Sequence, residues 1–379
     1  MPNSENKTEL AVVIPLFNGA AHIEEALAGV CAQSAPPQEV VVVDDGSTDD
    51  GPDRVLRFAG RLPLRLLRRP NGGQSAARNI GVAEARSDWI AFLDQDDVWC
   101  PQHLANLKAA VDGGTDRTGW AYSDVAVVDA GGRLLEPSLL RGRPGRHPKR
   151  SLDECLAQDM FVLPSAALVS RHAFTAVGGF DERLSGYEDD DLFLRLMCAG
   201  FHNIHVDAPT VLRRRHEGAA SHAVRMERSL MIYARKLLAG FPDRPEEQRF
   251  PSRDLIAPRF CWTLLARWAM ADRAGNREAA ALARAGLREL LSHLRPNRRR
   301  IGAAILHIAS LPVVGGACLR AAHGLRQHAR RTSRPMLGAA KARRLSPPWQ
   351  ERQAVCRGLD VDPTNQALPP SHPRATEWP

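Results

Sequence analysis

Residues 89–97 constrain the fold more than any other segment, because five apolar residues lead directly into three carboxylates. They read WIAFLDQDD. An unbroken apolar run is typical of a strand that is buried on both faces of a sheet. Clustered carboxylates repel each other unless a cation lies among them, and their oxygens suit Mg²⁺ or Mn²⁺. Since ligands bind at the carboxyl ends of strands in open α/β sheets, Asp94 and Asp96 are predicted to form a metal site beside a nucleotide.

Other apolar runs alternate with amphipathic segments, and this order predicts an α/β fold with a Rossmann-like, mostly parallel sheet. The expected strands are residues 10–15, 39–43, 62–67, 89–93, 120–128 and 162–169. Helices are expected over residues 22–33, 75–86 and 189–198. Ser75 is predicted to cap the second of these helices, since a serine side chain accepts a bond from a free backbone N–H there.

The net charge of +8 conceals two oppositely charged regions. Residues 1–212 carry a net charge of −10, and residues 213–345 carry +19. The basic region is rich in Ala, Arg and Leu at helical spacing, which predicts helices over about residues 221–331. Such a region fits an anionic membrane surface, a phosphorylated substrate or nucleic acid, and it fits equally a solvated, arginine-rich surface.

The segment at residues 301–319 carries no formal charge and is close to the shortest length that spans a membrane. His307, Pro312 and its glycines count against a span. A buried helix hairpin, an interfacial segment and a true span therefore remain open at this point. The polar start, MPNSENKTEL, has no apolar h-region, so a cytoplasmic location is expected.

Five motifs along the first 196 residues point to one family. They are VVIPLFNG (12–19), VVVDDGSTDD (41–50), NGGQSAARNIG (71–81), FLDQDDVW (92–99) and GGFDERLSGYEDDDLFLRL (178–196). In this order and spacing the chain resembles the family 2 glycosyltransferases, from residue 10 to about residue 220. The resemblance implies an inverting enzyme with the GT-A fold, a nucleotide-sugar donor that is usually UDP-linked, a divalent cation and an acceptor hydroxyl.

The resemblance assigns the base and the ribose of the donor to the ends of the first two strands. It implies that Pro15, Phe17 and Asp45 lie there, with an aromatic surface that stacks and a carboxylate that accepts a base N–H. The segment 44–47 also fits a plain turn whose serine caps a helix. Both interpretations are kept at this point.

The donor diphosphate and the cation involve a second group of residues. Gly73 permits the backbone to approach a ligand closely, and Arg78 is a candidate for holding the donor, although it fits a salt bridge at the sheet rim equally well. The resemblance implies that Asp94 and Asp96 bind the cation and the donor, where the alternative is a solvated acidic loop. His216 follows three arginines and is a further candidate metal ligand, against the alternative of a structural histidine.

Glu188 and Asp189 match the pair of acids in the family at which the aspartate is the catalytic base. Inversion requires one in-line displacement, so a carboxylate must take the proton of the acceptor hydroxyl opposite the leaving group. Acids in a first helical turn also stabilise the helix dipole. Four consecutive acids, residues 188–191, exceed what this stabilisation needs, which favours catalysis for Asp189 and leaves Asp191 as a structural residue.

These observations predict a GT-A core with an α-helical C-terminal extension. Residues 1–220 are the expected catalytic domain, in which 10–115 bind the nucleotide sugar and 116–220 the acceptor. Residues 221–335 are the expected basic helical region. Residues 336–379 are an expected Pro-rich tail of low order.

The predicted function is a metal-dependent inverting glycosyltransferase in cell-surface polysaccharide or glycolipid synthesis, with Mn²⁺ or Mg²⁺ as cofactor. Expected partners are a nucleotide-sugar donor, a glycan or lipid-linked acceptor and the anionic inner face of a membrane, with no nucleic acid. One alternative is a sugar-phosphate nucleotidyltransferase, although no early glycine-rich loop with a basic residue follows the first strand. The other is a non-catalytic scaffold of the same fold, which the intact Asp94, Asp96 and Asp189 disfavour.

Overall fold

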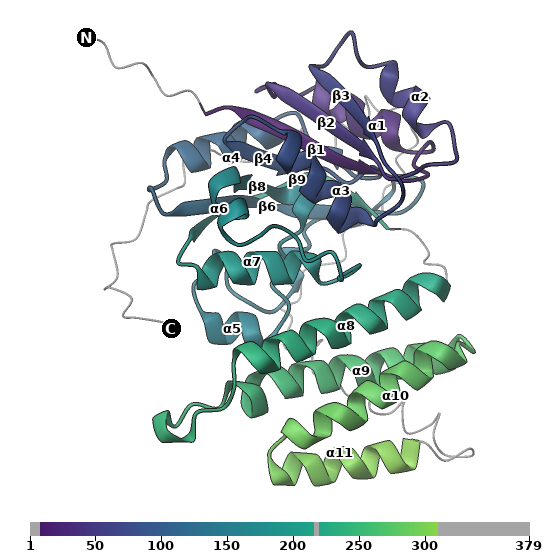
Figure 1. Ribbon diagram of the computed structural model, residues 1–379, viewed down its shortest axis with the longest axis vertical. Helices are drawn as coiled ribbons and strands as arrows, with labels where there is room; N and C mark the ends of the chain where they lie inside the picture. The colour runs from purple at the N-terminus through teal and green to yellow at the C-terminus, as the bar shows by residue number, and fades with distance from the viewer. Residues whose placement is uncertain (1–7, 216–219, 310–379) are drawn as a thin grey trace.

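The fold is organised around one mixed sheet, as the computed structural model shows for residues 8–215 and 220–309 (Figure 1). Its described strands lie in the order β3-β2-β1-β4-β8-β6-β9-β5, and β7 pairs with β6. They are β1 (Leu10–Leu16), β2 (Glu39–Asp44), β3 (Leu64–Arg68), β4 (Trp89–Phe92), β5 (Val98–Trp99), β6 (Thr118–Val128), β7 (Leu134–Glu136), β8 (Ala167–Ser170) and β9 (His202–Arg214). Each predicted apolar run overlaps a strand, whereas the short β5 and β7 and the long β9 lie outside those runs.

The first half of the sheet is parallel. β3, β2, β1 and β4 pair side by side, and Val12 of β1 lies opposite Val40 of β2 and Ala91 of β4. Parallel strands of this kind end at the same edge of the sheet. The residues that follow β1, β2 and β4 are therefore brought together, and these are the residues predicted to bind nucleotide and metal.

The second half of the sheet mixes directions. β8 pairs antiparallel with β4 and β6, β6 pairs in parallel with β9, and β9 pairs antiparallel with β5. β8 begins at Ala167 rather than at residue 162, because Pro164–Ala166 form a single 3₁₀ turn. Proline has no N–H to donate to a strand ladder, which is why the apolar run does not extend the strand backwards.

Helices cover both faces of the sheet. They are α1 (Ile23–Cys31), α2 (Gly51–Leu56), α3 (Gln74–Glu84), α4 (His103–Asp112), α5 (Leu152–Ala157), α6 (Arg171–Ala176) and α7 (Glu188–Cys198). Successive residues of a strand point to opposite faces. Val12 of β1 accordingly packs in the core with α1, α2 and α4, whereas Val13 packs in the core with α3, α6 and α7.

A helical extension, residues 220–309, lies beyond α7 and α5 (Figure 1). It contains α8 (Ala220–Gly240), α9 (Ala257–Arg273), α10 (Arg277–Leu290) and α11 (Pro296–Ala309). Phe193 of α7 belongs to the same buried cluster as Tyr233, Phe260 and Leu287 of the extension. One apolar core therefore runs from the sheet through α7 into the extension, and the division of the chain near residue 220 stays a prediction.

The start of α3 differs from the expected cap. Gly73, with a φ of 91°, is the residue before the helix, and no side chain caps it. Ser75 lies inside the first turn and donates its hydroxyl to the carbonyl of Leu184 at 2.9 Å. The prediction of a Ser75 cap is wrong, because this serine is buried against the segment before α7 instead of facing the free N–H groups.

The uncharged segment 301–319 is described only as far as Ala309, where α11 ends. Leu306 is buried against the rest of the extension, while Ile301 and Ile308 are exposed. Among residues 8–215 and 220–309, no helix combines the length and the apolar character that crossing a bilayer needs. The remainder of the segment and the expected Pro-rich tail lie outside the described residues.

Candidate active site

The ends of β1 and β4 are joined by one glutamine. Pro15 is buried within β1, whereas Phe17 follows the strand and exposes 46% of its surface. Gln95 accepts the N–H of Phe17 at 2.8 Å and donates to its carbonyl at 3.1 Å. Sequence reasoning assigned no role to Gln95, because a polar residue between two acids gives no indication of a partner 78 positions away. The two bonds hold the backbone of Phe17 beside the acidic loop, residues 94–97.

Asp45 binds the loop that precedes α3. Its carboxylate accepts the N–H of Gly72 at 2.9 Å and of Gly73 at 2.7 Å, and Arg69 lies 3.3 Å away. The positive φ of Gly73 is a backbone conformation that glycine adopts without strain. Asp45 therefore shapes the loop expected to approach the donor, and its contact with a base stays a prediction.

Arg78 of α3 connects the two acidic groups of the site. Its side chain is only 1% exposed, and it donates to Asp94 at 2.5 Å and to Glu188 at 3.1 Å. Burial disfavours the charged guanidinium, yet Asp94 and then Glu188 raise the pKa of Arg78 above its usual value. The structure thus forms the salt bridge that the sequence left open, and it joins the carboxyl end of β4 to the first turn of α7.

Other residues at the start of α3 bind the segment that leads into α7. Gln74 donates to Glu188, and Ser75 donates to Leu184. Asn79 exchanges two bonds with the backbone of Phe180, each of 2.9 Å. Gln74 was outside the predicted site, because its bond spans 114 positions and leaves no local pattern. Together these contacts place the start of α3 against the start of α7.

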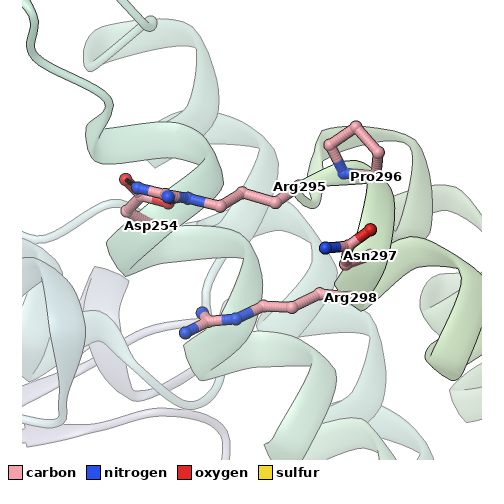
Figure 2. Close-up of a pocket in the computed structure, with 5 residues that line it drawn as sticks. All are labelled: Asp254, Arg295, Pro296, Asn297 and Arg298. Carbon is pink, nitrogen blue, oxygen red and sulfur yellow. Dashed lines mark hydrogen bonds and ion pairs between the residues drawn. The ribbon is translucent and has the colours of Figure 1, made fainter.

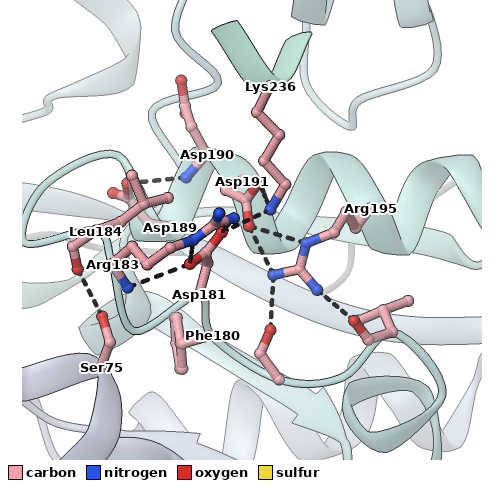
Figure 3. Close-up of polar contacts among 12 residues, drawn as sticks. Ser75, Phe180, Asp181, Arg183, Leu184, Asp189, Asp190, Asp191, Arg195 and Lys236 are labelled. Atoms are coloured by element: carbon pink, nitrogen blue, oxygen red, sulfur yellow. Dashed lines mark hydrogen bonds and ion pairs between the residues drawn. The ribbon is translucent and has the colours of Figure 1, made fainter. Parts of the chain in front are cut away.

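Two acids in the first turn of α7 pair with cations from the helical extension, and Figure 3 shows the pair of Asp191 with Lys236. Asp190 accepts from Arg259 of α9 at 2.5 Å. Asp191 lies 2.6 Å from Lys236 of α8 and 2.7 Å from Arg195 of α7 itself. Burial raises the pKa of Asp190 to about 6, while the charge of Arg259 acts in the opposite direction.

Asp189 differs from its three acidic neighbours. Its carboxylate accepts the backbone N–H of Asp190 at 2.8 Å, and no cation of the described chain lies within 4.0 Å of it. It is partly exposed, whereas Glu188 and Asp190 are buried. Burial, and then the charges of Glu188 and Asp190, raise the pKa of Asp189 well above its ordinary value. Asp189 is therefore the acid of this turn whose carboxylate has no cation as a partner among the described residues.

Three carboxyl groups lie close together in the acidic loop. Asp97 is buried and accepts the N–H of Arg214 at 3.2 Å. Burial, and then the charges of Asp94 and Asp96, raise the pKa of Asp97 to about 8. Asp94 and Asp96 are partly exposed. The loop therefore concentrates carboxylates where a cation would relieve their repulsion.

The side chains of the acidic loop supply only some of the ligands that a divalent cation needs. Two aspartates supply oxygen ligands of the kind that Mg²⁺ and Mn²⁺ prefer, but such ions need about six ligands. Within the residues that the structure describes, no group of three or more acidic, His or Cys side chains could hold a metal ion. A cation held there would therefore need oxygen ligands besides these two side chains. His216, the third predicted ligand, lies outside the described residues.

A pocket of about 640 Å³ lies on the helical extension (Figure 2). It is lined by Asp254, Arg295, Pro296, Asn297 and Arg298. Arg295 forms a two-pronged ion pair with Asp254 there. The predicted site residues are absent from its lining, so it is separate from the site between β4 and α7.

Two family models match the part of the chain that builds this site. The model of Glycosyl transferase family 2 matches residues 11–175, and that of Glycosyltransferase like family 2 matches residues 149–232. Residues 11–232 belong to glycosyltransferase family 2. The expected resemblance is thereby confirmed.

Curated relatives of this family 2 chain match parts of their own length. An uncharacterized glycosyltransferase of Rickettsia felis is 25% identical over 214 residues, which are 54% of this chain and 34% of the relative. One from Nostoc sp. is 37% identical over 147 residues, 38% of this chain and 44% of the relative. The succinoglycan biosynthesis protein ExoW of Rhizobium meliloti is 43% identical over 103 residues, 26% of this chain and 32% of ExoW. The chain thus spans less than half the length of these relatives.

Solved structures share the fold. Residues 1–349 of TarS from S. aureus, in complex with UDP-GlcNAc, superpose with a TM-score of 0.59 at 17% identity. The match covers 85% of this chain and 92% of that one. A longer TarS structure gives a TM-score of 0.56 at 16% identity, over 83% of this chain and 54% of that one. The predicted fold class, a GT-A core with C-terminal helices, is confirmed.

Proposed function

We propose that this family 2 chain is an inverting glycosyltransferase, which moves a sugar from a nucleotide-diphosphate sugar to an acceptor hydroxyl. The observation that carries the proposal is the bridge made by Arg78. One buried guanidinium contacts both Asp94, at the donor edge of the sheet, and Glu188, next to Asp189. The two predicted acidic groups therefore meet at a common place, as a single displacement between donor and base requires.

The donor side of this proposal rests on the edge formed by β1, β2 and β4. Phe17 offers an exposed ring for the base, and Asp45 with Gly73 shapes the neighbouring loop. Asp94 and Asp96 would hold Mn²⁺ or Mg²⁺ together with the diphosphate. When bound, such an ion neutralises the charge that builds on the leaving nucleoside diphosphate. A UDP-linked sugar is the proposed donor, and the UDP-GlcNAc complex of TarS supports that choice of first probe.

Asp189 is the proposed base. As the acceptor oxygen forms its bond to the anomeric carbon, the bond to the diphosphate oxygen breaks and the hydroxyl proton passes to the Asp189 carboxylate. The raised pKa of Asp189 makes its ionised form a stronger proton acceptor. The pairing of Glu188, Asp190 and Asp191 with cations supports this choice, because it leaves one carboxylate of the turn for the acceptor.

The proposed acceptor is a growing glycan or a lipid-linked glycan of the cell surface. ExoW, a relative named for succinoglycan biosynthesis, supports a role in polysaccharide synthesis. The net charge of +19 over residues 213–345 supports contact with a phosphorylated lipid or an anionic membrane face. The proposed site of action is the cytoplasmic side of that membrane.

The test combines donor binding with turnover. UDP-, GDP- and dTDP-sugars are titrated with Mn²⁺ by calorimetry, and release of the nucleoside diphosphate to water is followed for the sugar that binds. Asp189→Asn should retain the affinity and lower turnover by roughly 10²- to 10⁴-fold, the usual contribution of a general base. Asp207→Asn, at an exposed position of β9, is the matched control and should change neither. Full turnover in Asp189→Asn, or no binding of any sugar, would overturn the proposal.

A further inference from the structure

Two cations of the helical extension contact the first turn of α7. Lys236 of α8 lies 2.6 Å from Asp191 and 3.0 Å from Asp181, and Figure 3 shows its side chain directed at both. Arg259 of α9 donates to Asp190 at 2.5 Å. Charge-assisted bonds of this kind are short and directional, so they restrict the positions of the Asp190 and Asp191 side chains.

Arg259 is also bonded to the segment around α5. Its guanidinium donates to the carbonyl of Cys155 at 3.0 Å and to Asp159 at 2.8 Å, in addition to Asp190. The side chain is nearly inaccessible to solvent. Three acceptors in fixed directions define the place of the planar guanidinium, and therefore the place of the Asp190 carboxylate that it binds.

The residue before α7 is held from the same side. Tyr187 has a φ of 66°, which is a costly backbone conformation for a residue with a bulky side chain. Its ring stacks on Tyr233 of α8 with centroids 5.8 Å apart, and its hydroxyl accepts from Arg267 of α9 at 3.2 Å. The extension therefore contacts the chain immediately before and immediately after Glu188 and Asp189.

We propose that Arg259 and Lys236 are positioning residues for the transfer reaction, through which the helical extension sets the direction of Asp189. The inference rests on the proposed function, in which Asp189 is the base. Among the described contacts, Asp189 bonds only to the backbone of Asp190. The orientation of its carboxylate therefore follows the orientation of the first turn of α7, which the ion pairs of Asp190 and Asp191 fix. A misplacement of about 1 Å can cost about 100-fold in rate.

A purely structural role of the extension predicts a different pattern. Loss of an ion pair would then lower stability and leave kcat of the remaining folded protein unchanged. A positioning role predicts a lower kcat at unchanged donor affinity, because neither cation lies at the donor edge of the sheet. The split between kcat and the KM for the donor therefore separates the two roles.

Helix α8 offers a matched pair of variants. Lys236 binds α7, whereas its neighbour Arg235 forms an exposed ion pair with Glu289 of α10. We expect Lys236→Met to lower kcat by about 10- to 100-fold with unchanged KM for the nucleotide sugar, and Lys236→Arg to restore most of the loss. Arg235→Met should leave kcat and KM as in the unchanged protein. Equal kcat in Lys236→Met and Arg235→Met would overturn the inference, and so would a parallel loss of donor affinity.

Arg259 is tested by a charge-preserving change, because Arg259→Met would leave Asp190 buried without a cation and endanger folding. A lysine retains the charge but cannot bind three acceptors in the same directions. Arg259→Lys should therefore lower kcat, with the affinity for the calorimetrically selected nucleotide sugar unchanged.

The two proposals fail separately. If Asp189→Asn retains turnover, the assignment of the base is wrong. If Asp189→Asn abolishes turnover while Arg259→Lys and Lys236→Met keep full kcat, the positioning role is wrong and the base stands.

Discussion

The ion pairs of Arg78 predict how much the free energy of unfolding changes when this arginine is replaced. In Arg78→Met the volume of the side chain is nearly kept, but Glu188 loses its cation while its side chain remains buried. Removing one partner of a buried ion pair lowers the free energy of unfolding by about 3–5 kcal/mol, since an uncompensated charge is left inside the protein. Asp94 adds less, because its side chain is 34% exposed and water screens it.

A second substitution isolates the charge. In the double variant Arg78→Met/Glu188→Gln the buried group is a neutral amide, which can still accept the bond from Gln74. We expect the double variant to be more stable than the sum of the single changes predicts, with a coupling of about 1–3 kcal/mol. Urea unfolding followed by tryptophan fluorescence measures each free energy.

The control is an ion pair of the same chemistry on the surface. Arg228 and Glu278 pair at 3.3 Å with side chains that are 64% and 62% exposed. Arg228→Met should change the free energy of unfolding by at most about 1 kcal/mol. Equal losses in Arg78→Met and Arg228→Met, or strict additivity in the double variant, would refute the reasoning.

Three further predictions concern pH, metal and packing. Burial lowers the pKa of His103 to about 3, whereas the same side chain in the unfolded chain has a pKa near 6.5. The unfolded state therefore binds more protons as the pH falls, and the free energy of unfolding should decrease by about 2 kcal/mol from pH 7 to pH 5. In urea unfolding, His103→Phe should lose this part of the pH dependence. Asp96→Ala should remove the Mn²⁺ dependence of UDP affinity in calorimetry, and an unchanged dependence would contradict the metal site. A Cβ on Gly81 would lie 2.3 Å from Val13, so Gly81→Ala should cost about 1–3 kcal/mol in urea unfolding, whereas Gly60→Ala, which meets no atom within 4 Å, should not show this loss.

The sequence predicts the donor edge of the sheet because its information there is local. The apolar runs of β1, β2 and β4 indicate buried parallel strands, and the acids that follow β4 must then lie at their carboxyl ends. Asp94 and Asp189 could both be named from the chain alone. The common location of these acids could not, because it depends on one arginine whose two partners lie 16 and 110 positions away.

The polar contacts around α7 could not be predicted from the sequence. The periodicity of the sequence predicts which face of α8 or α9 is apolar. It does not distinguish Arg259 from the solvent-exposed arginines of a basic helix. Its burial follows from the packing of α9 against α5 and α7, which no local pattern encodes. Ser75 illustrates the same limit, since a good capping residue was recruited by the segment that follows Phe180.

The apolar core that runs from α7 into α8, α9 and α10 has a consequence for protein engineering. The described C-terminal helices therefore cannot be exchanged for those of another protein without disturbing the core around α7. A chimera joined near residue 220 must import the matching surface of α7 as well, or Asp190 and Asp191 will lose their ion pairs with α9 and α8.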